Sequence, residues 1–302
     1  MEYKVTLIIP AYNAEEYIRC TMDSILNQTF TNIKVIVIDD GSIDGTSNIV
    51  REYKLKDSRV FLIEKENSGI AATRNLGISL VDSKFFCFVD SDDILESNYV
   101  ECMYTKAVSD ASDIVFSDYN ILNKGMVSKV NTYIHGGPGD YITAMLAHGM
   151  WGVVWNKMFR TEFVIENEIY FLDGFNFWED LYFCISSLSH APLISHTRTS
   201  LYNYVIRENS LVNSDVSESK VKSKIKVVEE MLSLNNINID HKRELDAIKL
   251  HSKSEYLSSI NLFSPDKWKK AVPVNTISIL KAEMSMRDKV FPVLATSNLC
   301  FI

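Results

Sequence analysis

Long hydrophobic runs are absent from this sequence. Its longest apolar stretches span about five or six of the 302 residues, far fewer than the roughly 20 that a helix needs to cross a bilayer. The first residues include neither a basic segment nor a long apolar segment, so no secretory signal is expected. Five cysteines are scattered without a Cys-x-x-Cys pair. This pattern predicts reduced thiols in a cytoplasmic protein and argues against a disulfide framework or a zinc site.

Two further patterns of ligand-binding proteins are missing. The chain contains no Gly-x-Gly-x-x-Gly segment, which argues against an NAD-dependent dehydrogenase. Its six histidines include no His-x-x-x-His pair of the kind that binds zinc on a helix. His196 is the histidine considered as a metal ligand, and a structural role is preferred for it.

Positive charge is scarce over most of the chain. Residues 1–215 carry 29 acidic and 17 basic side chains, whereas residues 216–302 carry 10 acidic and 14 basic ones, for a net charge of −8. The acidic part would repel nucleic acid, so nucleic-acid binding is not expected. The basic end could contact an anionic membrane surface, or its lysines could simply lie on solvated helix faces.

Strands and helices are predicted to alternate through the first 118 residues. Ile18, Met22 and Ile25 lie on one face of a helix predicted over residues 15–28. Apolar, β-prone runs recur every 25 to 30 residues, at Val5–Ile9, Lys34–Ile38, Val60–Ile63, Phe85–Val89 and Asp113–Phe116. This alternation is typical of βαβ units and a mostly parallel sheet. Right-handed crossovers would bring the polar loops after these strands to one edge of the sheet, where they would line one cleft.

The remainder of the chain has a different composition. Residues 151–210 are rich in aromatic side chains, most of which are predicted to be core, while some could form a platform for a sugar ring. Glycine is absent from residue 216 onward, and helical spacing predicts helices over 216–235, 240–261 and 265–284. The sequence therefore predicts a helical C-terminal appendage, which could also pair with a second copy of the chain.

The apolar run Phe85–Val89 ends abruptly at three carboxylates, Asp90, Asp92 and Asp93. Closely spaced carboxylates repel one another unless a positive charge lies between them. A hard divalent cation, bound through oxygen atoms, is the natural candidate. The pattern predicts a metal site at the carboxyl end of a buried strand.

Five segments together resemble the family 2 glycosyltransferases, nucleotide-sugar-dependent enzymes of the inverting type with the GT-A fold. They occur in the family's order and are Val5–Asn13, Val37–Thr46, Gly69–Gly77, Phe88–Asp93 and Trp178–Asp180. The resemblance implies an α/β fold with a Rossmann-like, mostly parallel central sheet flanked by helices. It assigns residues 1–210 to the catalytic domain, with a nucleotide-binding half at 1–118 and an acceptor-binding half at 119–210. The helical region 211–302 matches no motif of the family.

The resemblance implies that the turn after the first strand holds the nucleotide base; the turn consists of Pro10, Ala11, Tyr12 and Asn13. Pro10 is expected to end the sheet hydrogen bonding, and Tyr12 is expected to lie against the base. Asp40, with Asp39 as the second choice, would accept the uracil N–H. The Asp40-x-Ser42-x-Asp44-Gly45 spacing imitates a calcium loop, but Arg51 stands where the loop needs glutamate, so that interpretation is rejected.

Further residues are implied to bind the diphosphate and a metal ion. Gly69 opens the helix that carries Arg74, whose guanidinium would contact the diphosphate or form a salt bridge with Asp90. In Asp90-Ser91-Asp92, Asp92 would coordinate Mn²⁺ or Mg²⁺ together with the donor diphosphate, and Asp90 would contact the ribose or a metal-bound water. Asp93 is expected to cap a helix that begins near Ile94.

The catalytic base is implied to lie in Trp178-Glu179-Asp180, at the start of a predicted helix. Asp180 would take the proton of the acceptor hydroxyl, and Glu179 would orient the acceptor or the base. Lys157 could contact the acceptor or a phosphate, and Arg207 could provide a second phosphate contact. A packing or surface role is the alternative for both cations.

These observations predict a hexosyltransferase. It would transfer a hexose or N-acetylhexosamine from a UDP-sugar to a glycan, lipid-linked in our interpretation, with inversion and metal assistance. The process would be surface polysaccharide synthesis, of lipopolysaccharide or capsule type, in the cytoplasm or at the inner face of the plasma membrane. One alternative is a sugar-nucleotide pyrophosphorylase, which the lack of a Gly-rich basic loop after the first strand disfavours. The other is an inactive transferase-like binding module, which the presence of Asp90, Asp92 and Asp180 disfavours.

Overall fold

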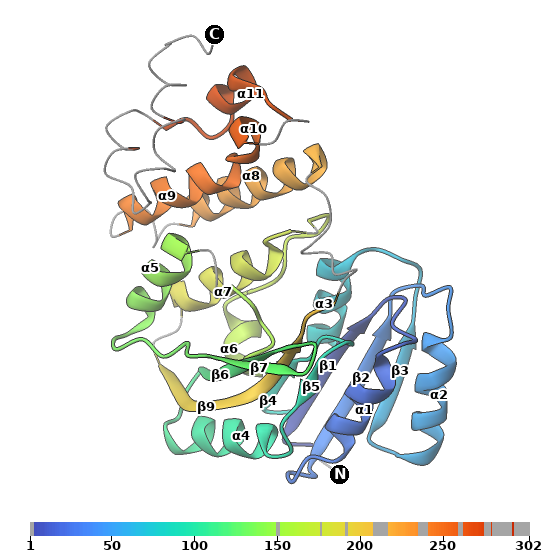
Figure 1. Ribbon diagram of the computed structural model, residues 1–302. Helices are drawn as coiled ribbons and strands as arrows, with labels where there is room; N and C mark the ends of the chain where they lie inside the picture. Colours follow the sequence, from blue (N-terminus) through green and yellow to red (C-terminus); the bar gives the residue numbers. More distant parts are fainter. Residues whose placement is uncertain are drawn as a thin grey trace.

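A computed structural model of the protein describes most of the chain. The described residues are 3–148, 152–175, 177–190, 193–207, 217–234, 241–258 and 262–274, with residues 279 and 292. Within them, one sheet of nine strands has the order β3-β2-β1-β4-β8-β6-β9-β5, and β7 pairs with β6 (Figure 1).

The first half of the sheet is parallel. Its strands are β1 (Val5–Ala11), β2 (Ile33–Asp39), β3 (Val60–Glu64) and β4 (Phe85–Phe88). The connecting helices are α1 (Ile18–Leu26), α2 (Thr46–Lys56) and α3 (Ile70–Ser79). The predicted βαβ alternation is confirmed, and Ile18, Met22 and Ile25 are buried on one face of α1 as expected.

The second half of the sheet is mixed. Strand β8 (Lys157–Arg160) is antiparallel to both β4 and β6, whereas β6 and β9 are parallel to each other. The other strands of this half are β5 (Ile94–Leu95), β6 (Ile114–Asn123), β7 (Met126–Val130) and β9 (Ile194–Val205). This arrangement confirms the predicted α/β fold with a central sheet flanked by helices.

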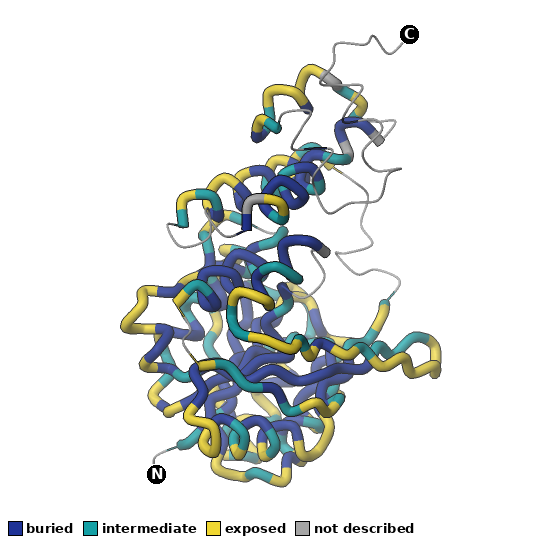
Figure 2. Tube along the Cα trace, turned by 90° about the vertical axis from the view of Figure 1, so that its left-hand side faces the viewer, coloured by how far each residue is buried: buried dark blue, intermediate teal, exposed yellow. Residues whose placement is uncertain are grey.

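Helices cover both faces of the sheet. Side chains alternate between the two faces along each strand, so each face offers apolar residues on which helices pack. Leu7 and Ile9 of β1 pack in one apolar cluster with α1, α2 and α4, while Ile8 packs in the other with α3, α5 and α7. The remaining helices of this part are α4 (Tyr99–Ser109), α5 (Pro138–His148), α6 (Thr161–Glu166) and α7 (Glu179–His190). Figure 2 shows buried residues running through the centre of the molecule.

Pro10 does not end the sheet hydrogen bonding, contrary to the expectation. Strand β1 continues to Ala11, and the carbonyl of Ala11 accepts a hydrogen bond from the N–H of Asp40 at 2.8 Å. On its other side, β1 pairs with β4 only as far as Ile8, opposite Phe88. A missing N–H at Pro10 is tolerated because the pairing with β4 has already stopped there.

The C-terminal helices pack on α5 and α7, on the side of the molecule away from α1, α2 and α4 (Figure 1). They are α8 (Glu218–Ser233), α9 (Lys242–Ser252), α10 (Glu255–Ser258) and α11 (Pro265–Lys270). Val221 and Ile225 of α8 belong to the same apolar cluster as Leu181 of α7. The division into domains near residue 210 falls outside the described residues and stays a prediction.

The predicted helices 216–235 and 240–261 correspond to α8 and to α9 with α10. The prediction for 265–284 is confirmed over α11 and at residue 279, which is helical, but it is wrong for residues 271–274. Ala271 has extended backbone angles (φ −79°, ψ 127°) and lies two residues before Pro273, which disfavours continuation of the helix. Residues 275–278 and 280–284 lie outside the described residues.

The end of α11 is held by a buried lysine. The ammonium of Lys253 donates hydrogen bonds to the carbonyls of Trp268 at 3.1 Å, Ala271 at 2.7 Å and Val272 at 3.0 Å. These carbonyls lie where a helix C-terminus leaves acceptors unsatisfied, so the lysine fixes α11 on the loop after α9.

Two further findings concern the length and polarity of the helices and the state of the cysteines. None of the helices in the described ranges is long and apolar enough to cross a membrane. The four cysteines that the structure describes, Cys20, Cys87, Cys102 and Cys184, are all free thiols.

Candidate active site

The loops after β1 and β2 are joined by hydrogen bonds at the carboxyl edge of the sheet. Asn13 has a left-handed backbone (φ 50°), its N–H donates to Ser42 Oγ at 2.9 Å, and its Oδ1 accepts the N–H of Ile43 at 3.0 Å. Tyr12, beside it, is 52% exposed and presents its ring to solvent. The prediction that these two loops meet at one edge is confirmed.

Asp39 and Asp40 are both buried and serve to fix these loops. Asp39 accepts hydrogen bonds from the N–H of Ser42 at 3.1 Å and from the hydroxyl of Ser47. Asp40 accepts from the N–H of Gly69 at 3.0 Å, from the N–H of Ser68 at 2.9 Å, and from the ammonium of Lys65. A carboxylate offers about four acceptor positions, so Asp40 retains little capacity for a nucleotide base.

Gly69 connects the loop after β3 to α3. Its φ of 87° is in the left-handed region that glycine adopts without strain. This conformation directs its N–H to Asp40 and starts α3 at Ile70. The predicted helix that carries Arg74 therefore begins at the expected place.

Arg74 joins the two acidic motifs. Its guanidinium is buried and donates to Asp90 Oδ1 at 3.2 Å and to Glu179 Oε1 at 3.0 Å. The rings of Phe88 and Phe171 lie within 5.9 Å and 5.3 Å of the guanidinium carbon. Of the two roles considered for Arg74, the structure shows the ion pair with Asp90, and it adds Glu179 as a second partner.

The three carboxylates after β4 form a cluster. Oxygen atoms of Asp90, Asp92 and Asp93 all lie within 4.8 Å of one another. Burial and the neighbouring Asp90 raise the pKa of Asp92 to about 6, against the opposing effect of Arg207. Burial and the nearby carboxylates of Asp90 and Asp92 raise the pKa of Asp93 well above its ordinary value. The carbonyl between them, that of Ser91, accepts from the hydroxyl of Thr21 at 3.0 Å, which fixes the loop on α1.

The expectation that Asp93 caps a helix beginning near Ile94 is wrong. Ile94 starts the short strand β5, and the next helix begins only at Tyr99. Asp93 is almost fully buried and accepts from the Tyr202 hydroxyl at 2.8 Å and from the N–H of Val205 at 2.9 Å. Its carboxylate is thus used to fix β9 against the acidic loop.

The cluster fits a divalent cation through two of its members. Asp93 has both oxygens engaged, whereas the side chain of Asp92 is 43% exposed and that of Asp90 is 26% exposed. Carboxylate oxygens are the ligands that Mg²⁺ and Mn²⁺ prefer. Burial and the neighbouring Asp90 raise the pKa of Asp92, and a divalent cation bound at its carboxylate would favour the charged form.

Arg207 forms an ion pair with Asp92, the predicted metal ligand. Arg207 lies two residues after β9; its Nη1 is 2.9 Å from Asp92 Oδ2, and its Nη2 donates to the Asp92 carbonyl. The guanidinium carbon lies 3.4 Å from the centre of the Tyr17 ring. The structure shows Arg207 beside the Asp92 carboxylate, and its predicted contact with a phosphate stays a prediction.

Glu179 and Asp180 begin α7 as predicted, and they differ in environment. Glu179 is buried against Arg74, and its pKa is raised to about 7 by burial and by Asp180, while Arg74 opposes this. Asp180 is partly exposed, and its Oδ1 accepts the N–H of Leu181 at 2.8 Å. Burial also raises the pKa of Asp180, again against the effect of Arg74.

Two other candidates have structural contacts. Lys157 is buried in β8 and donates to Asn156 Oδ1 at 2.8 Å and to the carbonyl of Val153, so its observed contacts are those of packing. His196 contacts Thr132 Oγ1 at 2.9 Å through Nε2 and accepts the N–H of Arg198 at 2.8 Å through Nδ1. Both ring nitrogens are engaged, which supports the structural role.

Sequence reasoning missed Tyr202 and Tyr17. The Tyr202 hydroxyl donates to Asp93 and accepts the N–H of Asp90 at 3.1 Å, while the Tyr17 ring supports Arg207. Each is one tyrosine among 14, and contacts that span more than 100 residues leave no local signal in a sequence.

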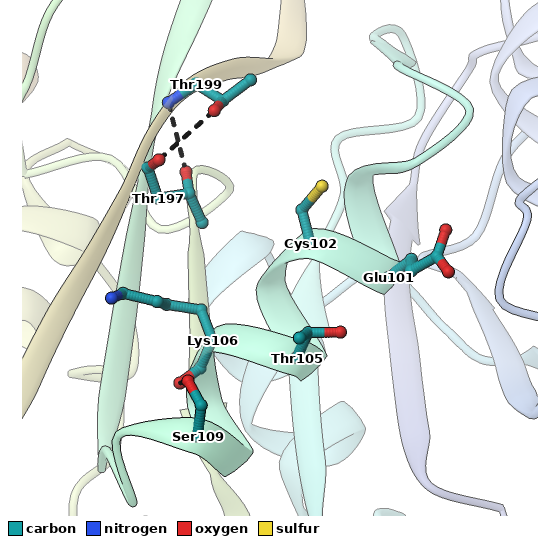
Figure 3. Close-up of a pocket in the computed structure, with 7 residues that line it drawn as sticks. All are labelled: Glu101, Cys102, Thr105, Lys106, Ser109, Thr197 and Thr199. Atoms are coloured by element: carbon teal, nitrogen blue, oxygen red, sulfur yellow. Dashed lines mark hydrogen bonds between the residues drawn. The ribbon is translucent and has the colours of Figure 1, made fainter.

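A separate hollow of about 330 Å³ lies between α4 and the middle of β9 (Figure 3). It is lined by Glu101, Cys102, Thr105, Lys106, Ser109, Thr197 and Thr199. None of these residues belongs to the acidic site described above.

Comparisons with known proteins agree with the fold. The model of the glycosyl transferase family 2 matches residues 6–161. EpsH of Bacillus subtilis strain 168, whose name classes it as a glycosyltransferase without stating a reaction, is 34% identical over 82% of this chain and 75% of its own. The Escherichia coli protein WfgD, a UDP-Glc:α-D-GlcNAc-diphosphoundecaprenol β-1,3-glucosyltransferase, is 34% identical over 42% of this chain and 49% of its own.

A solved structure extends the agreement to the whole architecture. TarS of S. aureus, residues 1–349 in complex with UDP-GlcNAc, superposes with a TM-score of 0.74 at 23% identity and covers 92% of this chain and 81% of its own. At this identity the similarity shows the fold. The architecture is that of the GT-A fold. The chain belongs to the glycosyl transferase family 2 and is a glycosyltransferase.

The Arg74 ion pairs predict a measurable loss of stability. Replacing Arg74 with Gln leaves the buried Glu179 without a counter-charge, which should lower the free energy of unfolding by about 3–5 kcal/mol. The double variant R74Q/E179Q should recover part of this loss, because it also removes the buried carboxylate. Urea denaturation measures both. Equal unfolding free energies for R74Q and the native protein would contradict the proposed importance of the pairs.

Proposed function

We propose that the protein transfers a hexose or N-acetylhexosamine from a UDP-sugar to a glycan acceptor with inversion at the anomeric carbon. The observation that carries this proposal is the position of Arg74, which holds Asp90 of the first acidic motif and Glu179 of the second at one guanidinium. A group bound at Asp90 and Asp92 would therefore lie near a carboxylate on α7.

The donor side is built from the loops after β1 to β4. The exposed ring of Tyr12 offers a face for a base, beside Pro10, Ala11 and Asn13. Asp40 is the first candidate to accept the uracil N–H, and Asp39 is the second. The name of WfgD includes UDP-Glc, and the TarS structure contains UDP-GlcNAc; these names support a UDP-linked donor.

Asp92 and Asp90 are the residues that would hold Mn²⁺ or Mg²⁺. When bound there, such an ion supplies positive charge that stabilises the leaving nucleoside diphosphate. Asp93 stays outside the ligand set in this proposal because Tyr202 and Val205 engage its oxygens.

Asp180 is the proposed base. Its carboxylate is partly exposed, and one oxygen is fixed by the N–H of Leu181, whereas Glu179 is turned to Arg74. The acceptor oxygen forms a bond to the anomeric carbon while the bond from that carbon to the diphosphate oxygen breaks. The hydroxyl proton passes to Asp180. One displacement from the opposite face gives inversion.

The acceptor we propose is a lipid-linked glycan in surface polysaccharide synthesis. The name of WfgD, whose acceptor is a sugar on diphosphoundecaprenol, supports this class. The excess of lysine and arginine in residues 216–302 supports peripheral contact with an anionic membrane face. A homodimer through the same region remains a hypothesis.

The assignment of the base predicts a separation of binding from transfer. Asp180→Asn should lower kcat by roughly 10²- to 10⁴-fold, because it removes the proton acceptor, while affinity for UDP with Mn²⁺ stays close to native. Asp92→Asn should instead lose the Mn²⁺-dependent part of nucleotide binding. Transfer assays and calorimetry measure the two effects. Native turnover by D180N would disprove the assignment.

The contact between Arg207 and Asp92 predicts a competition with metal. In the nucleotide-free protein, Arg207→Gln should raise the affinity for Mn²⁺ several-fold, since a guanidinium no longer occupies the Asp92 carboxylate. Electron paramagnetic resonance of free Mn²⁺ gives this affinity without any turnover. Arg198→Gln is the matched control, because Arg198 lies on β9 and its guanidinium carbon lies 3.7 Å from the centre of the Tyr133 ring. Unchanged Mn²⁺ affinity in R207Q would contradict the competition.

A further inference from the structure

The helix α8 contacts the two residues that immediately precede the catalytic carboxylates. Lys220 places its ammonium 4.7 Å from the centre of the Phe177 ring, and Lys224 places its ammonium 5.3 Å from the centre of the Trp178 ring. Between them, Ser223 Oγ donates to the carbonyl of Phe177 at 3.5 Å. Lysines four residues apart lie on the same helix face, so this face of α8 covers the segment that leads into α7.

Trp178 has a backbone conformation that a tryptophan rarely adopts. Its φ is 66°, in the left-handed region that is unfavourable for a bulky side chain. Such conformations persist where the surrounding structure holds them, and they occur frequently at functional sites. The carbonyl of Trp178 accepts the N–H of Tyr182 at 3.0 Å, so the reversal at Trp178 is also the point where α7 starts.

The conformation of Trp178 therefore sets where Asp180 points. Glu179 has its own anchor in Arg74, whereas the described hydrogen bond of Asp180 is to the N–H of Leu181 within the same helix turn. A change of φ at Trp178 would rotate the first turn of α7 and move the Asp180 carboxylate with it. Asp180 thus depends on a strained residue two positions earlier.

The supporting face of α8 is fixed independently of these contacts. Val221 and Ile225 are buried in the same apolar cluster as Leu181 of α7. At the start of the helix, Glu218 pairs with Lys267 of α11 at 2.8 Å. The helix that carries these lysines is therefore also held by apolar packing and by the Glu218–Lys267 ion pair.

We propose that Lys220, Ser223 and Lys224, termed the α8 clamp, hold Phe177 and Trp178 in the conformation that directs Asp180 at the acceptor. The inference rests on the proposed role of Asp180 as the base. It gives the C-terminal helical region, which carries no family motif, a positioning role in the transfer reaction. Lys224 is the central member, because its cation lies on the ring of the strained residue itself.

Lys224→Met tests the clamp in the full chain of 302 residues. We expect kcat for sugar transfer to fall by roughly 10- to 100-fold, as for a small misplacement of a reacting group, with native affinity for UDP and Mn²⁺. Lys224→Arg should restore most of the activity, since a guanidinium also stacks on an aromatic ring. Lys226→Met is the matched control, because Lys226 is exposed on the same helix and should keep native kcat.

Each outcome decides the question. A K224M protein with the kcat of K226M overturns the clamp, and so does a K224M protein that loses nucleotide affinity together with kcat, because the lysine would then stabilise the fold in general. In a D180N background, K224M should cause no further loss. If D180N itself keeps native turnover, the proposed base fails; if D180N is inactive while K224M is native, only the clamp fails.

Discussion

One buried guanidinium determines how the two halves of this enzyme meet. Arg74 lies on α3, and it pairs with Asp90 after β4 and with Glu179 at the start of α7, which are separated by 89 positions in the chain. Buried carboxylates are costly unless a cation neutralises them. Arg74 therefore offsets the cost of holding the two acidic motifs together. The same arrangement separates the roles of the neighbouring carboxylates, because Glu179 is bound to Arg74 whereas Asp180 remains accessible.

The rest of the site is organised around that contact. The parallel half of the sheet brings the loops after its strands to one edge, where Asp39 and Asp40 fix the backbone of their neighbours. Strand β9 returns beside the acidic loop and contributes Tyr202 and Arg207. The C-terminal helices share the core of α5 and α7, so they belong to the structure that supports the carboxylates.

Local sequence patterns predicted the parts of the fold that depend on local physics. The period of α1 and the apolar strands followed by polar loops identified the parallel half, and Asp90, Asp92, Glu179 and Asp180 were found by their motifs. Contacts between distant segments could not be predicted in this way. The use of Asp93 by Tyr202 and the contact of Arg207 with Asp92 depend on where β9 returns, and the tolerance of Pro10 depends on where β4 ends.

The central claim is that Asp90 and Glu179 act together through Arg74. A double-mutant cycle on kcat for sugar transfer, with Asp90→Asn and Glu179→Gln, measures this most directly. The account predicts that the combined loss is at least about tenfold smaller than the product of the single losses, and that this coupling disappears in an R74Q background. Single losses that simply multiply would show that the two motifs act independently, which would contradict the account.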